Sequence, residues 1–170
     1  MTTQRHPRLT IVLHWAMAAL LLGQLALGLW MMDLPKDSSG LRASWFNVHK
    51  SMGLMLLGLA AVRVAHLCVR RHLPPAHSPR WMQALARATH HLLYGLMVAV
   101  PLTGLLGSAW SNYPIRFFGL VLPRLAAPWE AGKAWMSQGH GVLTWLLMAT
   151  VAAHLIGRSE EHTSELQSRL

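Results

Sequence analysis

The stretch GHGVLTWLLMATVAAHLIG, residues 139–157, decides the fold class. It contains no Asp, Glu, Lys or Arg, and a helix needs about 20 mainly apolar residues to cross the hydrocarbon core of a bilayer. The whole chain agrees, since 53% of its 170 residues are hydrophobic and 12% are charged, against about a quarter charged in a soluble domain. We therefore expect an integral membrane protein.

Three further stretches have the length and composition of membrane spans. They cover residues 9–32, 45–69 and 88–110. The opening stretch extends back to about residue 136, so the fourth span is 136–157. Pro101 lies inside the third span, where a bundle tolerates proline because neighbouring groups satisfy the freed carbonyl. We expect an all-α fold, an integral membrane four-helix up-down bundle formed by residues 1–157.

The segments between the spans are predicted to be loops. Residues 33–40 and 71–80 are rich in the Pro, Gly, Ser and Asp that favour turns. Residues 111–133 are longer and partly apolar, so we expect a loop lying at the membrane interface, with a short helix. Most of the eight tryptophans fall near span ends or in loops, which is typical of an aromatic belt.

Four spans place both chain ends on one side of the membrane, and the basic residues indicate which side. Seven lie on the side of the termini: Arg5, Arg8, Arg63, Arg70, Arg71, Arg80 and Arg87. Six lie on the other: Lys36, Arg42, Lys50, Arg116, Arg124 and Lys133. This slight positive-inside excess predicts that both termini are cytoplasmic.

The last residues depart abruptly from the apolar run. RSEEHTSELQS, residues 158–168, looks like the translation of a sequencing-library adapter. We expect residues 158–170 to be an artefact and the native C-terminus to be missing. The alternative is a short polar tail.

Two histidines stand near opposite ends of the fourth span. His140 and His154 are fourteen residues apart, which on a helix is a rise of about 21 Å and a return to within about 40° of the same direction. An ionisable residue inside a span is a functional candidate by default. One metal ion cannot reach both residues, whereas two sites stacked across the bilayer can.

Each of these histidines has a candidate partner at its own depth. His14 lies early in the first span, level with His154, and His49 opens the second span, level with His140. Bis-histidine ligation of haem iron needs such pairs on facing helices. Zinc fits less well, because it usually takes more ligands, often thiolate or carboxylate. The alternative for each histidine is a hydrogen-bonded packing residue. Small residues beside the His49/His140 pair would let a porphyrin approach: Gly53, Gly139 and Gly141.

The chain resembles the bacterial cytochrome b561 family of four-helix dihaem membrane cytochromes. The matching stretches are RLTIVLHW (8–15), VHKSMG (48–53), AAVR (60–63), HHLLYGLMVAVPLTG (90–104) and GHGVLTW (139–145), followed by His154. The resemblance covers residues 5 to 157. It implies ligands from the first, second and fourth helices, two haem b groups, a location in the bacterial inner membrane and quinone as one redox partner. One departure is that adapter-like sequence replaces the continuation of the fourth helix expected after His154.

His90 is the rival of His14 as partner of His154. It lies at the same depth and precedes Tyr94 by four residues, in an HxxxY pattern that the family shares. It could instead serve a quinone or a proton path, since imidazole exchanges protons near neutral pH. The alternative is a histidine bonded to a carbonyl.

Three basic residues are candidates to bind haem propionates. Arg8 and Arg63 are expected at the cytoplasmic surface and Lys50 at the opposite one. Buried carboxylates need such cations. The alternative is snorkelling of these side chains to lipid headgroups.

Other chemistry finds little support. The basic residues are divided between two faces, which argues against nucleic acid as a partner. The one cysteine, Cys68, excludes an internal disulfide framework. The sequence has no Gly-rich phosphate loop, no Ser-His-Asp candidate and no carboxylate pair within a span, so we expect no catalytic residues of these kinds.

The expected function is transmembrane transfer of single electrons between an unidentified donor and acceptor, in a direction that the haem potentials decide. One alternative is an enzyme that oxidises superoxide and reduces quinone, with the anion collected by Arg42, Lys50, Arg116, Arg124 and Lys133. Another is a haem-bearing subunit that joins a peripheral dehydrogenase or hydrogenase subunit. A third is a helical transporter without haem, in which the histidines relay protons.

Overall fold

A computed structural model describes the backbone of residues 8–36, 39–69 and 80–167. Its elements are α1 (Arg8–Trp30), α2 (Leu41–Val69), α3 (Arg80–Ala109), β1 (Arg116–Phe117), β2 (Leu120–Val121) and α4 (Glu130–Gln167). All four helices are long and apolar enough to cross a membrane. The all-α four-helix membrane fold expected from the sequence is confirmed.

Each predicted span falls mainly on one helix. The helices α2, α3 and α4 are longer than the apolar runs, whereas α1 ends at Trp30, two residues before the predicted end. The candidate spans are Thr10–Trp30, Leu41–Ala65, Arg80–Ala109 and Glu130–Ser159. A helix satisfies its own backbone hydrogen bonds, so it continues beyond the hydrocarbon into the interfacial layer. The loop predicted at 71–80 lies outside the described residues except for Arg80, which begins α3. The helix α4 continues to Gln167, so no break in it marks the predicted boundary after residue 157.

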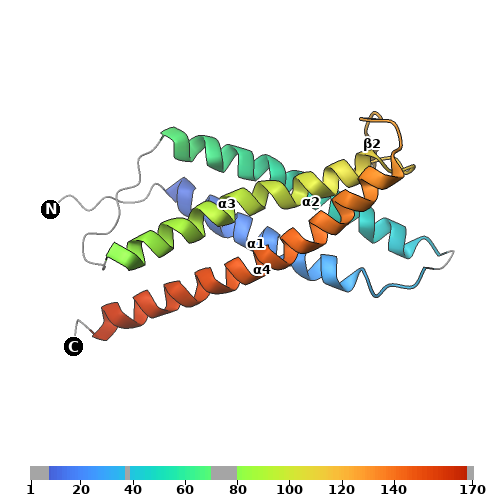
Figure 1. The fold of residues 1–170 in the computed structure, drawn as a ribbon. Helices are drawn as coiled ribbons and strands as arrows, with labels where there is room; N and C mark the ends of the chain where they lie inside the picture. Colours follow the sequence, from blue (N-terminus) through green and yellow to red (C-terminus); the bar gives the residue numbers. More distant parts are fainter. Residues whose placement is uncertain (1–7, 37–38, 70–79, 168–170) are drawn as a thin grey trace.

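The helices alternate in direction, and α1 begins at the same end of the bundle at which α4 ends (Figure 1). We call this the terminal end. The strands lie at the opposite end, which we call the hairpin end. Along the chain the bundle therefore runs up, down, up and down, as predicted.

The tightest packing is between α3 and α4, followed by α2 with α3 and α1 with α2. Its centre is a cluster of Leu96, Val100 and Leu147, against which leucines of α1 also pack. Large apolar side chains elsewhere face outward, as for Trp15 at 67% and Val142 at 69% exposure. Such an exterior suits a bilayer, where lipid is the solvent and buried groups contribute mainly packing contacts.

The connection between α3 and α4 contains a β-hairpin, and the short helix expected there is wrong. Arg116 pairs with Val121 and Phe117 with Leu120, so the loop has two residues. These are Phe118 and Gly119, with φ of 46° and 94°. Positive φ at both positions is the requirement of the type I′ turn, which matches the twist of two strands.

Ser51 of α2 holds the hairpin in place. Its Oγ accepts a hydrogen bond from the Phe118 N–H at 2.9 Å and lies 3.2 Å from the Arg116 carbonyl oxygen and 2.8 Å from that of Asn47. The side chain is 1% exposed. One hydroxyl therefore satisfies strand backbone groups that would otherwise lie unpaired beside the bundle, where such groups are costly.

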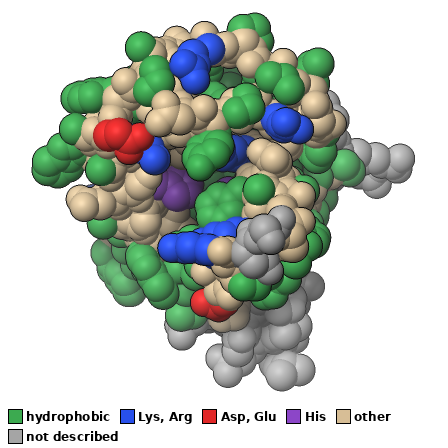
Figure 2. Space-filling view, turned by 90° about the vertical axis from the view of Figure 1, so that its right-hand side faces the viewer, with side chains coloured by type: hydrophobic (Ala, Val, Ile, Leu, Met, Phe, Trp, Pro, Cys, Tyr) green, Lys and Arg blue, Asp and Glu red, His purple; other side chains and the backbone are tan. Residues whose placement is uncertain are grey.

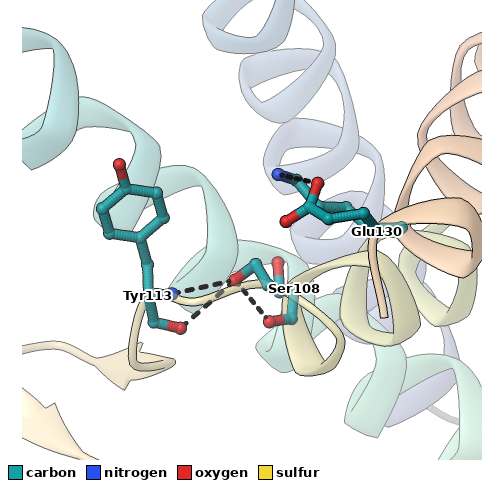
Figure 3. A network of polar contacts seen from close by, with 5 residues as sticks. Ser108, Tyr113 and Glu130 are labelled. Carbon is teal, nitrogen blue, oxygen red and sulfur yellow. Dashed lines mark hydrogen bonds and ion pairs between the residues drawn. The ribbon is translucent and has the colours of Figure 1, made fainter. Parts of the chain in front are cut away.

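A second polar network closes the end of α3 (Figure 3). The Ser111 hydroxyl donates to the Ser108 carbonyl oxygen at 2.7 Å and accepts from the Tyr113 N–H at 3.3 Å. Lys133 and Glu130 form an ion pair of 3.2 Å in the first turn of α4. Together these contacts fix where α3 stops and where α4 starts.

Candidate functional site

The histidines of the hairpin end meet between α2 and α4. The ring centroids of His49 and His140 are 6.2 Å apart, and the ring planes are at 86°. Two metal–imidazole bonds of about 2 Å put the ligating nitrogens about 4 Å apart and the ring centroids roughly 6 Å apart. The predicted pair His49/His140 therefore has the separation that two ligands of a single iron would have.

His140 is held in one tautomer. Its Nδ1 lies 2.9 Å from the carbonyl oxygen of Val100 and 3.5 Å from the Thr103 hydroxyl. A carbonyl oxygen can only accept, so Nδ1 carries the proton and Nε2 keeps its lone pair. Histidines that ligate metals are usually fixed in this way through the other ring nitrogen.

Two glycines on the neighbouring helices make room for the rings. A Cβ at Gly28 of α1 would lie 3.2 Å from Cε1 of His49, and a Cβ at Gly104 of α3 would lie 3.2 Å from Cε1 and Nδ1 of His140. Either side chain would displace an imidazole. The sequence pointed instead to other glycines, of which Gly139 and Gly141 face open space.

His49 has a distinct environment. Its carbonyl oxygen accepts a hydrogen bond of 2.7 Å from the Gln24 amide of α1. Its Nδ1 is buried and has no hydrogen-bond partner in the structure. A buried polar atom without a partner is uncommon and calls for an explanation.

At the terminal end, the ring of His154 on α4 lies 5.2 Å, centroid to centroid, from the ring of His90 on α3. The Nδ1 of His14 lies 3.4 Å from Nη2 of Arg63. Arg63 Nε also donates to the Tyr94 hydroxyl at 3.4 Å, with the guanidinium 5.9 Å from the centre of that ring. The structure thus brings His154 to His90 and His14 to Arg63, and both His14 and His90 remain candidates to pair with His154.

His90 and its neighbour His91 each bond to their own helix. Nδ1 of His90 lies 2.7 Å from the Ala86 carbonyl oxygen, and Nδ1 of His91 lies 2.8 Å from that of Arg87. Each therefore keeps the lone pair on Nε2. Both side chains are exposed, so the hydrogen bond to a carbonyl and a role toward a lipid-soluble ligand are compatible for His90.

The fold also leaves α4 apart from two of its neighbours. In the described part of the chain, α4 makes its extensive close contact with α3, not with α1 or α2. His49 of α2 nevertheless faces His140 of α4, with the two rings close to perpendicular. Haem iron needs only axial ligands from the protein, and among the described residues no three His, Cys, Asp or Glu side chains form a metal-binding group. The residues present therefore fit a planar group held between two imidazoles.

The basic residues differ in what their side chains contact. Lys50 is half-buried beside His49, and Arg8 begins α1, with its side chain outside the described part. Arg42 donates to the carbonyl oxygens of Met32 and Leu34 and covers the Phe46 ring. Viewed from the hairpin end, Lys and Arg side chains surround a histidine that is visible at the surface (Figure 2). Arg42 therefore has a local structural role, and Lys50 is the basic residue next to the histidine pair.

Comparisons with known proteins cover most of the chain. The model of a family described as prokaryotic cytochrome b561 matches residues 5–158. Cytochrome b561 homolog 2 of Escherichia coli (strain K12) is 29% identical over 161 residues, which cover 90% of this chain and 82% of that protein. The matched region contains all five candidate histidines, at positions 14, 49, 90, 140 and 154.

Proposed function

The chain belongs to the prokaryotic cytochrome b561 family, and we propose that it carries single electrons from one membrane surface to the other. As a member of this family with four membrane-spanning helices, it is a multi-pass bacterial membrane cytochrome that binds b-type haem and transfers electrons. In this proposal residues 1–157 hold two haem b groups, one near each surface. When bound, each haem supplies an iron that gains and loses one electron at a time. The family match ends at residue 158, so residues 159–170 of the proposed foreign tail lie beyond it.

The pair His49/His140 carries the proposal. Both rings are half-buried between α2 and α4, 6.2 Å apart, and the Val100 carbonyl directs the lone pair of His140 away from α3. Gly28 and Gly104 keep the space around the rings clear. We propose that these two imidazoles would hold the haem iron at the hairpin end.

His14 and His154 are the proposed ligands at the terminal end. His154 follows His140 by about four turns of α4 and faces the same side of that helix. Arg63 lies against His14 and Tyr94, so it can hold a propionate there or fix the direction of the His14 ring. Lys50 and Arg8 are proposed to bind propionates at the hairpin end and the terminal end.

We propose that quinone is one redox partner and that His90 exchanges its protons. His90 is exposed on α3, where a lipid-soluble molecule can reach it, and its ring contacts that of His154. A neutral imidazole with a free Nε2 lone pair can take up a proton and release it near neutral pH. The terminal end, with both termini, is placed on the cytoplasmic side in this proposal and the hairpin end on the periplasmic side.

The superoxide-oxidising alternative relies on five basic residues of the hairpin end. Arg42 is bonded to backbone carbonyls and Lys133 is paired with Glu130. Arg42 keeps its charge in these bonds, whereas the charge of Lys133 is offset by Glu130, so four of the five residues would attract an anion. Electron transfer with quinone is the function that we propose, and reduction of the haem by superoxide would favour this alternative instead.

The test is a count of haems in histidine variants. Reduced-minus-oxidised spectra and pyridine haemochrome analysis of the purified protein should give two b haems per chain, one fewer in His140→Ala and one fewer in His154→Ala. His91→Ala is the matched control, because His91 bonds to its own helix, and it should keep both haems. The reduced wild type should be reoxidised by a soluble quinone analogue. A folded protein with no haem, or with one haem unaffected by either change, would overturn the proposal.

A further inference from the structure

Gln24 is a buried amide in the middle of α1, and its contacts converge on His49. The side chain is 8% exposed, within a helix whose other residues from Leu9 to Trp30 are mainly apolar. Its Nε2 donates to the His49 carbonyl oxygen at 2.7 Å. An amide in such a position is costly unless its hydrogen-bonding groups have partners. The partner here is the backbone of a proposed haem ligand.

A glycine of α2, Gly53, lies beside the Gln24 amide. A Cβ built at Gly53 would lie 3.4 Å from Nε2 of Gln24. Gly53 is one turn after His49, so the amide occupies the space beside the ligand's own helical turn. The contact between α1 and α2 is therefore shaped around Gln24 and sets how deep His49 lies relative to α1.

Two atoms of this contact lack partners. They are Oε1 of Gln24 and Nδ1 of His49, both buried and without a hydrogen bond in the structure. Leaving such a buried group without a partner destabilises the fold. Their chemistry is complementary, because an amide oxygen accepts, and Nδ1 donates in the tautomer that leaves Nε2 for a metal.

Gly28 indicates that Oε1 of Gln24 and Nδ1 of His49 both lie where α1 meets α2. Gly28 follows Gln24 by one turn on the same face of α1, and a Cβ there would lie 3.7 Å from Nδ1 of His49. The Nδ1 edge of the ring is therefore turned toward the face of α1 that carries Gln24. One water molecule, or a rotation of the amide, can join the two atoms.

We propose that Gln24 is the positioning residue of His49. Its NH₂ group holds the His49 backbone, and its Oε1 accepts the Nδ1–H bond, directly or through one water molecule. Gln24 thereby does for His49 what the Val100 carbonyl does for His140. This inference rests on the proposed function, in which both histidines bind the same haem.

The proposal has a spectroscopic consequence. A hydrogen bond accepted from Nδ1–H makes the imidazole a stronger donor to iron, which favours the oxidised metal and lowers its reduction potential. Gln24→Met keeps the length of the side chain and removes both hydrogen-bonding groups. It should raise the midpoint potential of the hairpin-end haem, change the electron paramagnetic resonance signal of that oxidised haem and weaken its retention by about 10–100-fold. The terminal-end haem should be unaffected.

The experiment is a potentiometric titration of the haem-loaded protein followed in both haem bands, with Gln83→Met of α3 as the matched replacement. Gly53→Ala is a second, milder change, because its new methyl group would touch Nε2 of Gln24 at 3.4 Å, and it should shift the same haem in the same direction by less. His49→Ala runs alongside. If it removes one haem while Gln24→Met and Gly53→Ala leave both potentials and spectra unchanged, the role of Gln24 is overturned and the proposed function stands. If His49→Ala keeps both haems, the proposed function itself fails.

Discussion

The two histidine sites differ in what holds them. At the hairpin end, the Val100 carbonyl bonds the His140 ring, the backbones at Gly28 and Gly104 lie against the two rings, and the Gln24 side chain donates to the backbone carbonyl of His49. At the terminal end, contacts come from long side chains, with Arg63 reaching His14 and Tyr94 and with His154 lying on His90. Backbone groups cannot move without moving a helix, whereas side chains change rotamer readily. We therefore expect the hairpin-end site to be formed before haem binds and the terminal-end site to rearrange.

Replacing either candidate at the terminal end should have the largest effect. His14→Ala should remove one haem, because His154 then lacks an axial partner, and His90→Ala should keep both haems while slowing oxidation by a quinone analogue. Haem per chain and stopped-flow reoxidation measure the two outcomes. Loss of a haem in His90→Ala with retention in His14→Ala would instead assign His90 as the ligand. The contact between the rings of His90 and His154 would then be the arrangement that binds haem, and the terminal-end site would not need to rearrange.

Filling the glycine spaces should have the next largest effect. Gly28→Val and Gly104→Val each place a branched side chain where a Cβ alone is already 3.2 Å from an imidazole carbon. We expect most of the hairpin-end haem to be lost and the terminal-end haem to be kept, as measured by haem content and difference spectra. Gly23→Val and Gly95→Val are matched controls on the same helices, because nothing lies within 4 Å of a Cβ at those positions. Equal loss in variants and controls would mean that valine disturbs insertion rather than the site.

Removing one hydroxyl at each end should have the smallest effect. Tyr94→Phe loses the contact with Arg63, and Thr103→Val loses the group 3.5 Å from His140 Nδ1 while leaving the bond to Val100. Each hydrogen bond contributes about 0.5–1.5 kcal/mol. Both variants should keep two haems, and Tyr94→Phe should shift the terminal-end potential more than Thr103→Val shifts the other. Redox titration of the two proteins measures the two shifts in midpoint potential. A larger shift in Thr103→Val than in Tyr94→Phe would contradict the distinction between a site held by side chains and a site held by backbone groups.

The spans could be predicted because apolar composition over a fixed length is a local property. The ends of the helices could not, since Leu41, Arg80 and Glu130 begin helices that extend past the apolar runs. The hairpin was missed because the first residue of its turn is Phe118. Asn, Asp or Gly is the usual signal at a position with positive φ, and only Gly119 matched it.

Within the site, depth along each helix placed His49 and His140 at one level, and in the structure their ring centroids lie 6.2 Å apart. Depth alone could not identify Gly28 and Gly104, because which face of a helix meets its neighbour depends on packing between helices. Gln24 did carry a signal, as a lone polar side chain inside an apolar span. Its partner on α2 could be found only from the structure. At the terminal end, His14 and His90 share one depth, so the sequence alone leaves the choice of ligand to experiment.

The single hydroxyl of Ser51 also limits sliding between helices. Ser51 comes two residues after His49, and the hairpin that it holds is joined to α4 and its His140 through residues 122–129. A shift of α4 by one helical turn, about 5.4 Å, would pull on the hairpin and take two backbone groups away from this hydroxyl. The hairpin therefore opposes such a shift. One serine outside the ligand pair helps to keep His49 and His140 at the same level, although their helices are far apart in the sequence.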